Sequence, residues 1–215
     1  MIKCALFDLD GTLVNTIVDL GRAVDYVLEQ FGCNAKWTID DYKRFVGNGA
    51  KKLIDRAFSH TIDEFQLNKA YELFKEKYNA ILLDNAKAYD GIIEAVKELK
   101  AKGIKLAVVT NKPQSSAVLM VESIFKNDFF DAIVGAAEDT PKKPDPYPAN
   151  KALALLGCKP SEAIYFGDSD IDVYTAKNAG IEAVACSWGF RSRESLVAAE
   201  PSVIIDSADY IVKLI

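Results

Sequence analysis

The chain has 215 residues, half of them hydrophobic and 27% charged, with 26 Lys and Arg against 31 Asp and Glu. This composition is that of a globular protein, and the net charge of −5 favours neither nucleic acid nor an anionic membrane as a partner. No apolar run approaches the ~18 residues of a membrane span, and the first one is too short for a signal peptide. Four scattered cysteines without a C-x-x-C pair predict free thiols, so we expect a cytoplasmic protein.

Hydrophobic periodicity predicts one strand and then several helices in the first part of the chain. Residues 2–7 are apolar and β-prone, and a helix follows over 16–31 until Gly32. A short helix is predicted within 38–49 before a Gly-Asn-Gly break, and another over 50–58. Thr61 with Glu64 has the spacing of a capping box that opens a helix toward residue 80. Residues 84–91 then form a linker.

Strands and helices alternate in the remainder of the chain. Helices are predicted over 91–102, 113–125, 147–156 and 171–179, and strands over 105–110, 130–135, 163–168 and 182–186. Such alternation is typical of βαβ units and a parallel sheet. We therefore predict an α/β core made of residues 1–15 and 86–215, with an all-helical insertion over 16–85 after the first strand.

Polar residues follow several of these strands at the point where each strand ends. Asp8 and Asp10 follow the first strand, Thr110 and Asn111 the second, and Asp168 the fourth. In an open α/β sheet, ligands bind outside the carboxyl ends of the strands. Each residue alone has an ordinary explanation as a helix cap, a turn residue or a surface charge. Together, at one edge of the sheet, they predict a functional site.

Four segments resemble the motifs of the haloacid dehalogenase superfamily of phosphatases. They are "DLDGT" (8–12), the threonine after "AVV" (107–110), "KKPDP" (142–146) and "GDSDID" (167–172). The insertion contains "VGNGAKKLIDRAF" (46–58), which is similar to the cap segment of phosphoglycolate phosphatase-like members, and "WGFRSRESL" (188–196) is typical of that branch. The resemblance implies a Rossmann-like core with a helical cap.

This resemblance implies a role for each matching residue. Asp8 would attack the phosphorus and form an aspartyl-phosphate, which divides a difficult hydrolysis into two easier steps. Asp10 would protonate the leaving oxygen and later take a proton from water. The Thr110 side chain, the Asn111 backbone N–H and Lys143 would hold the transferring phosphoryl group.

The resemblance also implies a magnesium ion. Mg²⁺ prefers oxygen ligands, and it would be held by the carboxylates of Asp8 and Asp168 and by the main-chain carbonyl of Asp10. Asp172 would support the metal site from outside the ligand shell. We interpret Asp170 as the N-cap of the helix that follows rather than as a ligand.

The expected substrate is a small phosphorylated metabolite such as 2-phosphoglycolate, and the insertion is expected to select it through Asn48, Lys51 and Lys52. Two alternatives remain open. A β-phosphoglucomutase-like mutase or a sugar phosphatase would share all four motifs. A receiver-like phosphorylation module, which is not an enzyme, would also be α/β, but it has no reason to carry the helical insertion. We assign no catalytic role to His60 or Lys142.

Overall fold

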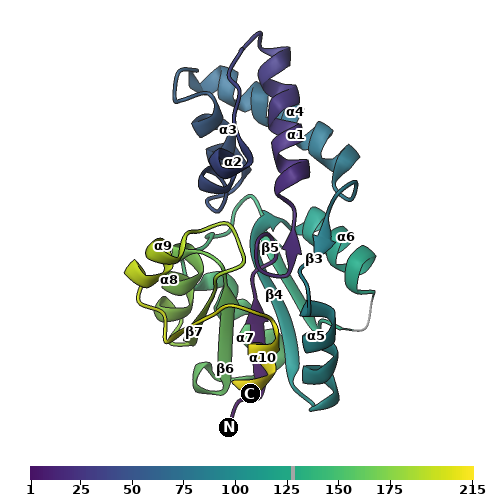
Figure 1. Ribbon diagram of the computed structural model, residues 1–215, viewed down its shortest axis with the longest axis vertical. Coiled ribbons are helices and arrows are strands. Elements are labelled where there is room, and N and C mark those ends of the chain that lie inside the picture. Colours follow the sequence, from purple (N-terminus) through teal and green to yellow (C-terminus); the bar gives the residue numbers. More distant parts are fainter. Residues whose placement is uncertain (127–128) are drawn as a thin grey trace. The chain divides into compact units, whose positions relative to one another are not determined.

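The computed structural model describes residues 1–126 and 129–215. These residues form two compact units, which we call the core unit (Met1–Asn15 with Ala88–Ile215) and the helical unit (Thr16–Lys87). The predicted insertion ended at residue 85, whereas the helical unit ends at Lys87. The short strands β2 (Val14–Asn15) and β3 (Lys87–Ala88) pair at the positions where the chain passes from one unit to the other. Figure 1 shows the elements of each unit.

The core unit is built on a parallel sheet, as the sequence predicts. Over the described residues the sheet has six strands in the order β5-β4-β1-β6-β7-β8, and every pair of neighbours is parallel. The strands are β1 (Cys4–Phe7), β4 (Lys105–Pro113), β5 (Ala132–Ala136), β6 (Ala163–Gly167), β7 (Glu182–Cys186) and β8 (Val203–Ile205). The predicted α/β class is confirmed, and β8 is an edge strand that periodicity did not reveal.

Helices cover both faces of this sheet, so the central strands are buried on both sides, as expected for a parallel sheet. On one face, Leu6 and Tyr165 pack into a cluster with apolar residues of α7, α8 and α9. On the other face, Phe7 stacks on Phe166 with ring centroids 5.0 Å apart. The core helices are α5 (Ile92–Ala101), α6 (Gln114–Phe125), α7 (Tyr147–Leu156), α8 (Asp170–Asn178), α9 (Arg193–Ala198) and α10 (Asp209–Lys213), with a 3-10 turn at Pro160–Glu162.

The strand β4 is longer than predicted and carries an irregularity at its carboxyl end. Its register against β5 shifts between Val109 and Pro113. A bulge of this kind bends a strand and redirects side chains, and bulges are frequent next to active sites. Pro113 therefore ends β4 and precedes α6, whereas the sequence had placed it in the first turn of the helix.

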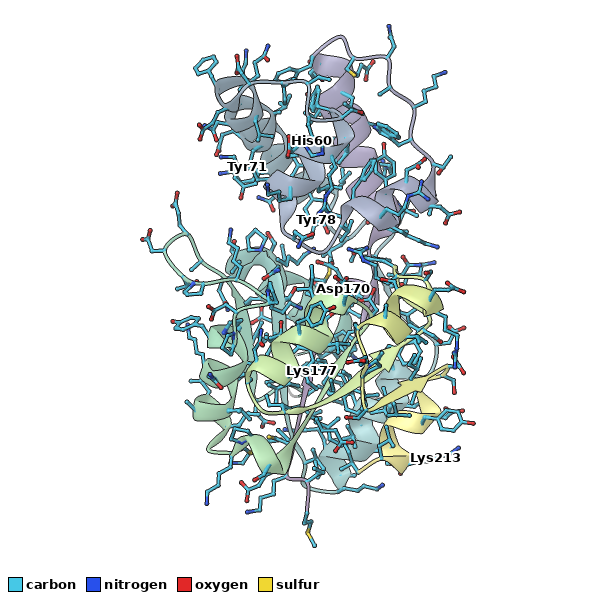
Figure 2. The ribbon with its side chains drawn as sticks, turned by 90° about the vertical axis from the view of Figure 1, so that its left-hand side faces the viewer. His60, Tyr71, Tyr78, Asp170, Lys177 and Lys213 are labelled. Carbon is cyan, nitrogen blue, oxygen red and sulfur yellow. The ribbon has the colours of Figure 1, made fainter. Side chains whose placement is uncertain are left out.

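The helical unit contains α1 (Ile17–Gln30), α2 (Ile39–Phe45), α3 (Ala50–Ala57) and α4 (Glu64–Ile81). The predicted capping box at Thr61 is wrong, because Asp63 is the N-cap of α4 and its side chain accepts from Gln66 N at 2.7 Å. Thr61 instead donates its hydroxyl to Phe58 O. His60 is exposed beside Asp55 in this unit (Figure 2).

Two further features of the chain bear on its chemistry. All four cysteines are free thiols, in agreement with the sequence analysis. Within residues 1–126 and 129–215, no helix combines the length and hydrophobicity that crossing a bilayer requires.

Candidate active site

The loop after β1 places Asp8 and Asp10 at the carboxyl edge of the sheet. Asp8 N donates to Phe166 O at 2.9 Å, which continues the pairing of β1 with β6 and fixes the backbone of Asp8. The chain then turns, and Gly11 N donates to Val14 O at 2.9 Å. Gly11 has a φ of +94°, and a Cβ there would lie 2.4 Å from Asp168 Oδ2. The tight turn therefore requires glycine both for its backbone angle and for the space that Asp168 occupies.

Three buried carboxylates converge beside this loop. One oxygen from each of Asp8, Asp168 and Asp172 lies within 4.8 Å of the others. The sequence analysis assigned Asp8 and Asp168 as metal ligands and Asp172 as a residue that supports them. The structure brings these three side chains together. The Asp10 side chain lies outside this group and contacts Lys112 instead.

Asp168 is held by two segments far apart in the sequence. Its Oδ1 accepts from Thr12 Oγ1 at 3.0 Å, and its Oδ2 accepts from Phe190 N at 2.7 Å. Trp188 Nε1 donates to Thr12 O at 3.0 Å, and a Cβ at Gly189 would lie 2.2 Å from Asp168 Cβ. The segment Trp188–Phe190 thus supports the acidic cluster directly, a role the sequence analysis did not assign to it. The signal in the sequence that could have revealed this role was the family-like motif over residues 188–196.

Asp172 has two functions in the local structure of α8. Its Oδ2 accepts from Ser169 N at 3.1 Å, and Ser169 is the N-cap of the helix. The prediction that Asp170 caps this helix is therefore wrong. Asp170 is the first residue of α8 and is partly exposed, 3.5 Å from Arg191 Nε (Figure 2). The Asp172 Oδ1 atom accepts from Lys143 Nζ at 2.6 Å, which fixes the lysine against the carboxylates.

Lys143 is the central cation of the cluster, with a side chain that is 3% exposed. Its ammonium donates to Val109 O at 3.1 Å, to Tyr165 Oη at 3.3 Å and to Asp172 Oδ1. These three acceptors match its three protons. Asp8 Oδ1 lies 2.8 Å from the same nitrogen as an ion pair, yet this buried oxygen accepts no hydrogen bond from the described residues. Tyr165 was not predicted as a site residue, because its strand position suggested only a core aromatic.

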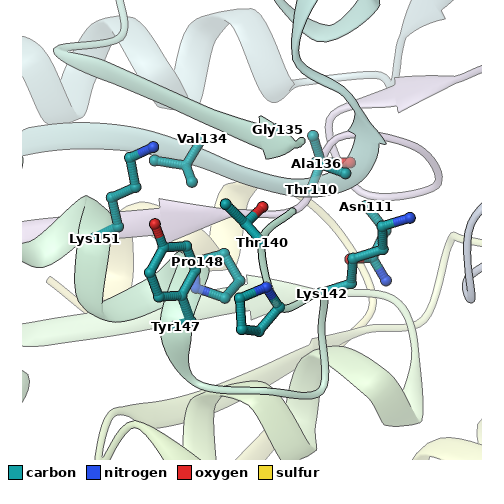
Figure 3. A pocket seen from close by; sticks show the side chains of 11 residues that line it. Thr110, Asn111, Val134, Gly135, Ala136, Thr140, Lys142, Tyr147, Pro148 and Lys151 are labelled. Carbon is teal, nitrogen blue, oxygen red and sulfur yellow. The ribbon is translucent and has the colours of Figure 1, made fainter. Parts of the chain in front are cut away.

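Asn111 connects the lysine loop to the end of β4. Its side-chain Nδ2 donates to Lys143 O at 3.1 Å, and its Oδ1 accepts from Lys143 N at 2.9 Å. The side chain is therefore occupied in holding the loop. Thr110 is buried, and its Oγ1 accepts from Lys112 N at 3.2 Å. Thr110 and Asn111 line a small pocket with the exposed Lys142 (Figure 3).

Crowding of negative charge raises the pKa values of two acids. Burial, followed by repulsion from Asp172, raises the pKa of Asp8 to about 8, although Lys143 opposes this shift. Burial and Asp172 also raise the pKa of Asp168 to about 7, against the hydrogen bonds from Phe190 and Thr12. Burial lowers the pKa of Lys143, but Asp172 and Asp8 outweigh it and hold the pKa well above the usual value. A single buried lysine thus does not compensate three buried carboxylates.

The cluster has the donor set of a divalent cation site. Three carboxylate oxygens within 4.8 Å of one another provide hard ligands, and Asp8 Oδ1 is buried without a hydrogen bond among the described residues. Three buried carboxylates that share one lysine leave an excess of negative charge, which is costly unless a further cation is present. The residues therefore fit a bound metal ion.

Lys112 is a site residue that the sequence analysis missed. Its Nζ lies 3.0 and 3.2 Å from the two oxygens of Asp10, and its side chain is 2% exposed. A lysine at the end of a strand is most often a surface residue. Lys112 lies at the carboxyl end of β4, where the register against β5 shifts, and periodicity does not show such a shift.

The helical unit contains the residues predicted to select the substrate. Asn48, Lys51 and Lys52 are exposed at the loop before α3 and at its first turn. Arg56 donates to Phe45 O and to Asn48 Oδ1, both at 2.7 Å. Arg56 therefore holds this loop in shape from within the same unit, a role that the sequence analysis did not assign to it.

Comparison with known proteins identifies the class. The family model of the haloacid dehalogenase-like hydrolases matches residues 5–186. The chain therefore belongs to the haloacid dehalogenase-like hydrolases, as its motifs had indicated. Within this family it is an enzyme of the phosphoric monoester hydrolase class.

Individual relatives agree over nearly the whole chain. A phosphoglycolate phosphatase from Psychrobacter arcticus is 32% identical and covers 97% of this chain and 95% of its own length. Phosphoglycolate phosphatase 1 of Pseudomonas aeruginosa is also 32% identical, over 95% of this chain and 76% of its own length. Among solved structures, a protein assigned as a phosphoglycolate phosphatase from Lactobacillus delbrueckii superimposes with a TM-score of 0.94 at 31% identity, covering 99% of this chain and 97% of its own. The phosphate complex of CbbY from Rhodobacter sphaeroides gives 0.83 at 25% identity, covering 100% and 96%.

Proposed function

We propose that the protein hydrolyses 2-phosphoglycolate, or a similarly small anionic phosphate ester, through an aspartyl-phosphate on Asp8 and with Mg²⁺ as its metal. The observation that carries this proposal is the convergence of Asp8, Asp168, Asp172 and Lys143 at the carboxyl edge of the sheet. The relatives named phosphoglycolate phosphatase support the choice of substrate. Four free thiols support a place in the reducing cytoplasm.

Asp8 is the nucleophile in this proposal. Its main chain is fixed to β6, and its carboxylate lies beside the Lys143 ammonium at the carboxyl edge of the sheet, which holds it in place for attack. Lys143 balances part of the charge on Asp8 and on the transferring phosphoryl group. The Thr110 side chain and the Asn111 backbone N–H orient the phosphoryl oxygens. The Asp10 carboxyl group, in its protonated form, gives its proton to the leaving oxygen, and the carboxylate that results then accepts a proton from the attacking water.

The carboxylates of Asp8 and Asp168 and the main-chain carbonyl of Asp10 would hold the Mg²⁺ ion. When bound, the ion reduces the repulsion between an anionic nucleophile and an anionic phosphate. Asp172 then serves as a positioning residue, since both of its oxygens already accept hydrogen bonds from Lys143 and Ser169. The loop with Asn48, Lys51 and Lys52 would recognise the part of the substrate beyond the phosphate.

The test of this function is phosphate release from a panel of small esters. The purified chain is given 2-phosphoglycolate, glycerol phosphates, hexose phosphates and 4-nitrophenyl phosphate at equal concentration with Mg²⁺. We expect kcat/KM to be highest for 2-phosphoglycolate. If no ester releases phosphate, the phosphatase proposal is wrong. If hexose phosphates release phosphate as fast as 2-phosphoglycolate does, only the substrate assignment is wrong.

Metal removal should stop the reaction. We expect activity to vanish after dialysis against a chelator and to return with Mg²⁺ but poorly with Ca²⁺, whose longer and more numerous ligand bonds would loosen the geometry. Asp168→Ala should abolish the rise in Tm that Mg²⁺ causes, while the matched variant Asp170→Ala, at a partly exposed position, should keep it. Full activity after chelation, or equal loss of the Tm shift in both variants, would contradict the metal assignment.

Hydrolysis of a sugar phosphate is the second candidate function. The specific observation that favours it is the structural similarity to CbbY, which has been crystallised with phosphate and, as a variant, with xylulose 1,5-bisphosphate. The hexose phosphate arm of the panel distinguishes this candidate. A mutase would convert hexose phosphates without releasing phosphate.

A further inference from the structure

Lys112 carries a buried charge to which the proposed chemistry gives no task. Its side chain is 2% exposed and that of Asp10 15%, and Lys112 Nζ contacts both Asp10 oxygens at 3.0 and 3.2 Å. Lysine is almost never buried to this degree without an anionic partner, because desolvation of the ammonium is costly. Asp10 pairs with Lys112, so any movement of the Asp10 carboxylate alters the environment of this lysine.

The contact competes with the proposed work of Asp10. To reach the leaving oxygen at hydrogen-bond distance, the Asp10 carboxylate has to direct an oxygen toward the substrate. Both of its oxygens are within hydrogen-bond distance of Lys112. Redirecting one of them weakens the pairing of a buried ammonium, which is unfavourable unless another anion approaches. An anionic group on the substrate near the leaving oxygen would supply that anion.

The position of Lys112 determines where on the substrate this group must be. Lys112 Nζ lies 3.0 and 3.2 Å from the two oxygens of Asp10, so an atom one hydrogen bond from that carboxylate lies no more than about 6 Å from the ammonium. In the phosphate ester of a 2-hydroxycarboxylate, the carboxylate is attached to the carbon that bears the ester oxygen. A carboxylate oxygen therefore lies about 3–4 Å from the ester oxygen. The ester of a neutral alcohol has no such group.

We propose that Lys112 determines substrate specificity by exchanging part of its contact with Asp10 for a carboxylate on the carbon next to the scissile ester oxygen. This inference rests on the proposed function, and it assigns recognition of the second anionic group to a core residue in addition to the exposed Lys51 and Lys52. Pairing of the substrate carboxylate with Lys112 would then both hold the substrate and release Asp10 for proton transfer. Esters without the carboxylate would bind their phosphate normally but leave Asp10 held by Lys112.

The experiment compares two esters of equal carbon number, 2-phosphoglycolate and 2-hydroxyethyl phosphate. The measured quantity is the ratio of their kcat/KM values in the wild-type chain and in Lys112→Met, Lys112→Arg and Lys142→Met. We expect Lys112→Met to lower the ratio at least about tenfold, the low end for losing one partner of a buried charge pair. Lys112→Arg keeps the charge and should retain more of the ratio. Lys142→Met removes an exposed lysine at the same edge and should change the ratio less than about twofold.

The competing explanations give different results. If Lys112 only holds Asp10 in place, both esters lose activity together and the ratio is unchanged, which overturns the proposal. If the paired substitution Lys51→Met and Lys52→Met lowers the ratio and Lys112→Met does not, recognition belongs to the helical unit and the proposal is again overturned. Turnover of 2-hydroxyethyl phosphate by the wild type shows independently that the phosphatase function stands. If the wild type turns over no ester, both the phosphatase function and the role of Lys112 are overturned.

A binding measurement covers the case in which Lys112→Met does not fold. Calorimetry on the Asp8→Asn chain, where Lys112 is intact and turnover is blocked, compares the two esters directly. Affinity at least about tenfold higher for 2-phosphoglycolate supports the proposal if the difference persists when Lys51→Met and Lys52→Met are added to the Asp8→Asn chain. Equal affinity for the two esters overturns it.

Discussion

Replacing Asp8 with asparagine is expected to leave less than about 1% of wild-type turnover. An amide of nearly equal volume is a poor nucleophile, so the covalent step is lost while the loop after β1 keeps its shape. The backbone bond from Asp8 N to Phe166 O does not involve the side chain and should persist. The measurement is phosphate release at saturating ester and Mg²⁺. Residual activity well above this limit would remove Asp8 from the nucleophile role.

The same variant should be more stable than the wild type when no metal is present. The pKa of Asp8 is raised to about 8 from an ordinary value of 3.8, so the folded chain retains a proton that the unfolded chain releases. The stability that this proton provides is complete below about pH 4 and is lost as the pH rises toward 8. Asparagine removes this dependence, because it has no proton to lose.

At pH 8 in chelator, we therefore expect the Tm of Asp8→Asn to exceed that of the wild type by roughly 2–4 °C for each kcal/mol of relief. The difference should shrink at pH 5, where the wild-type carboxyl is protonated, and it should reverse or vanish when Mg²⁺ is added. Thermal unfolding at the two pH values checks this. A variant that is less stable at pH 8 would mean that loss of the ion pair with Lys143 outweighs the relief of repulsion.

Asp10→Asn has the second largest expected effect, a loss of about 10²–10⁴ in kcat for an alkyl ester, as for other positioned acid–base groups. The amide oxygen can still accept a hydrogen bond from Lys112, so the loop should remain in place. With 4-nitrophenyl phosphate the loss should be smaller, because nitrophenolate leaves with little protonation. Equal losses for both substrates would show that Asp10 acts through the geometry of its loop and not as an acid.

The site was predictable where it follows directly from strand ends. Asp8, Thr110 and Asp168 come immediately after apolar runs, and parallel strands bring their carboxyl ends to one edge. What the sequence could not reveal depends on local geometry. Lys112, which pairs with Asp10, lies in the irregular end of β4, and a bulge leaves no periodic signal.

Capping and short elements were predicted less well for a related reason. Ser169 and Asp170 are both good N-cap residues, and only the hydrogen bonds between Ser169 and Asp172 decide between them. Thr61 and Asp63 present the same choice at α4. The edge strand β8 has three residues, too few for alternation to be distinguished from a loop.

The two glycines that contact Asp168 have a consequence for how this enzyme can vary. A methyl group at Gly11 or at Gly189 would lie within 2.4 Å of an atom of Asp168. Each glycine also precedes a residue that donates a hydrogen bond to Asp168, Thr12 after Gly11 and Phe190 after Gly189. Neither glycine has a side chain that could take part in proton transfer or phosphate binding. Mutational tolerance around the acidic cluster is therefore set by the available volume as well as by chemistry, and a change to alanine at either position would displace a carboxylate that it does not replace.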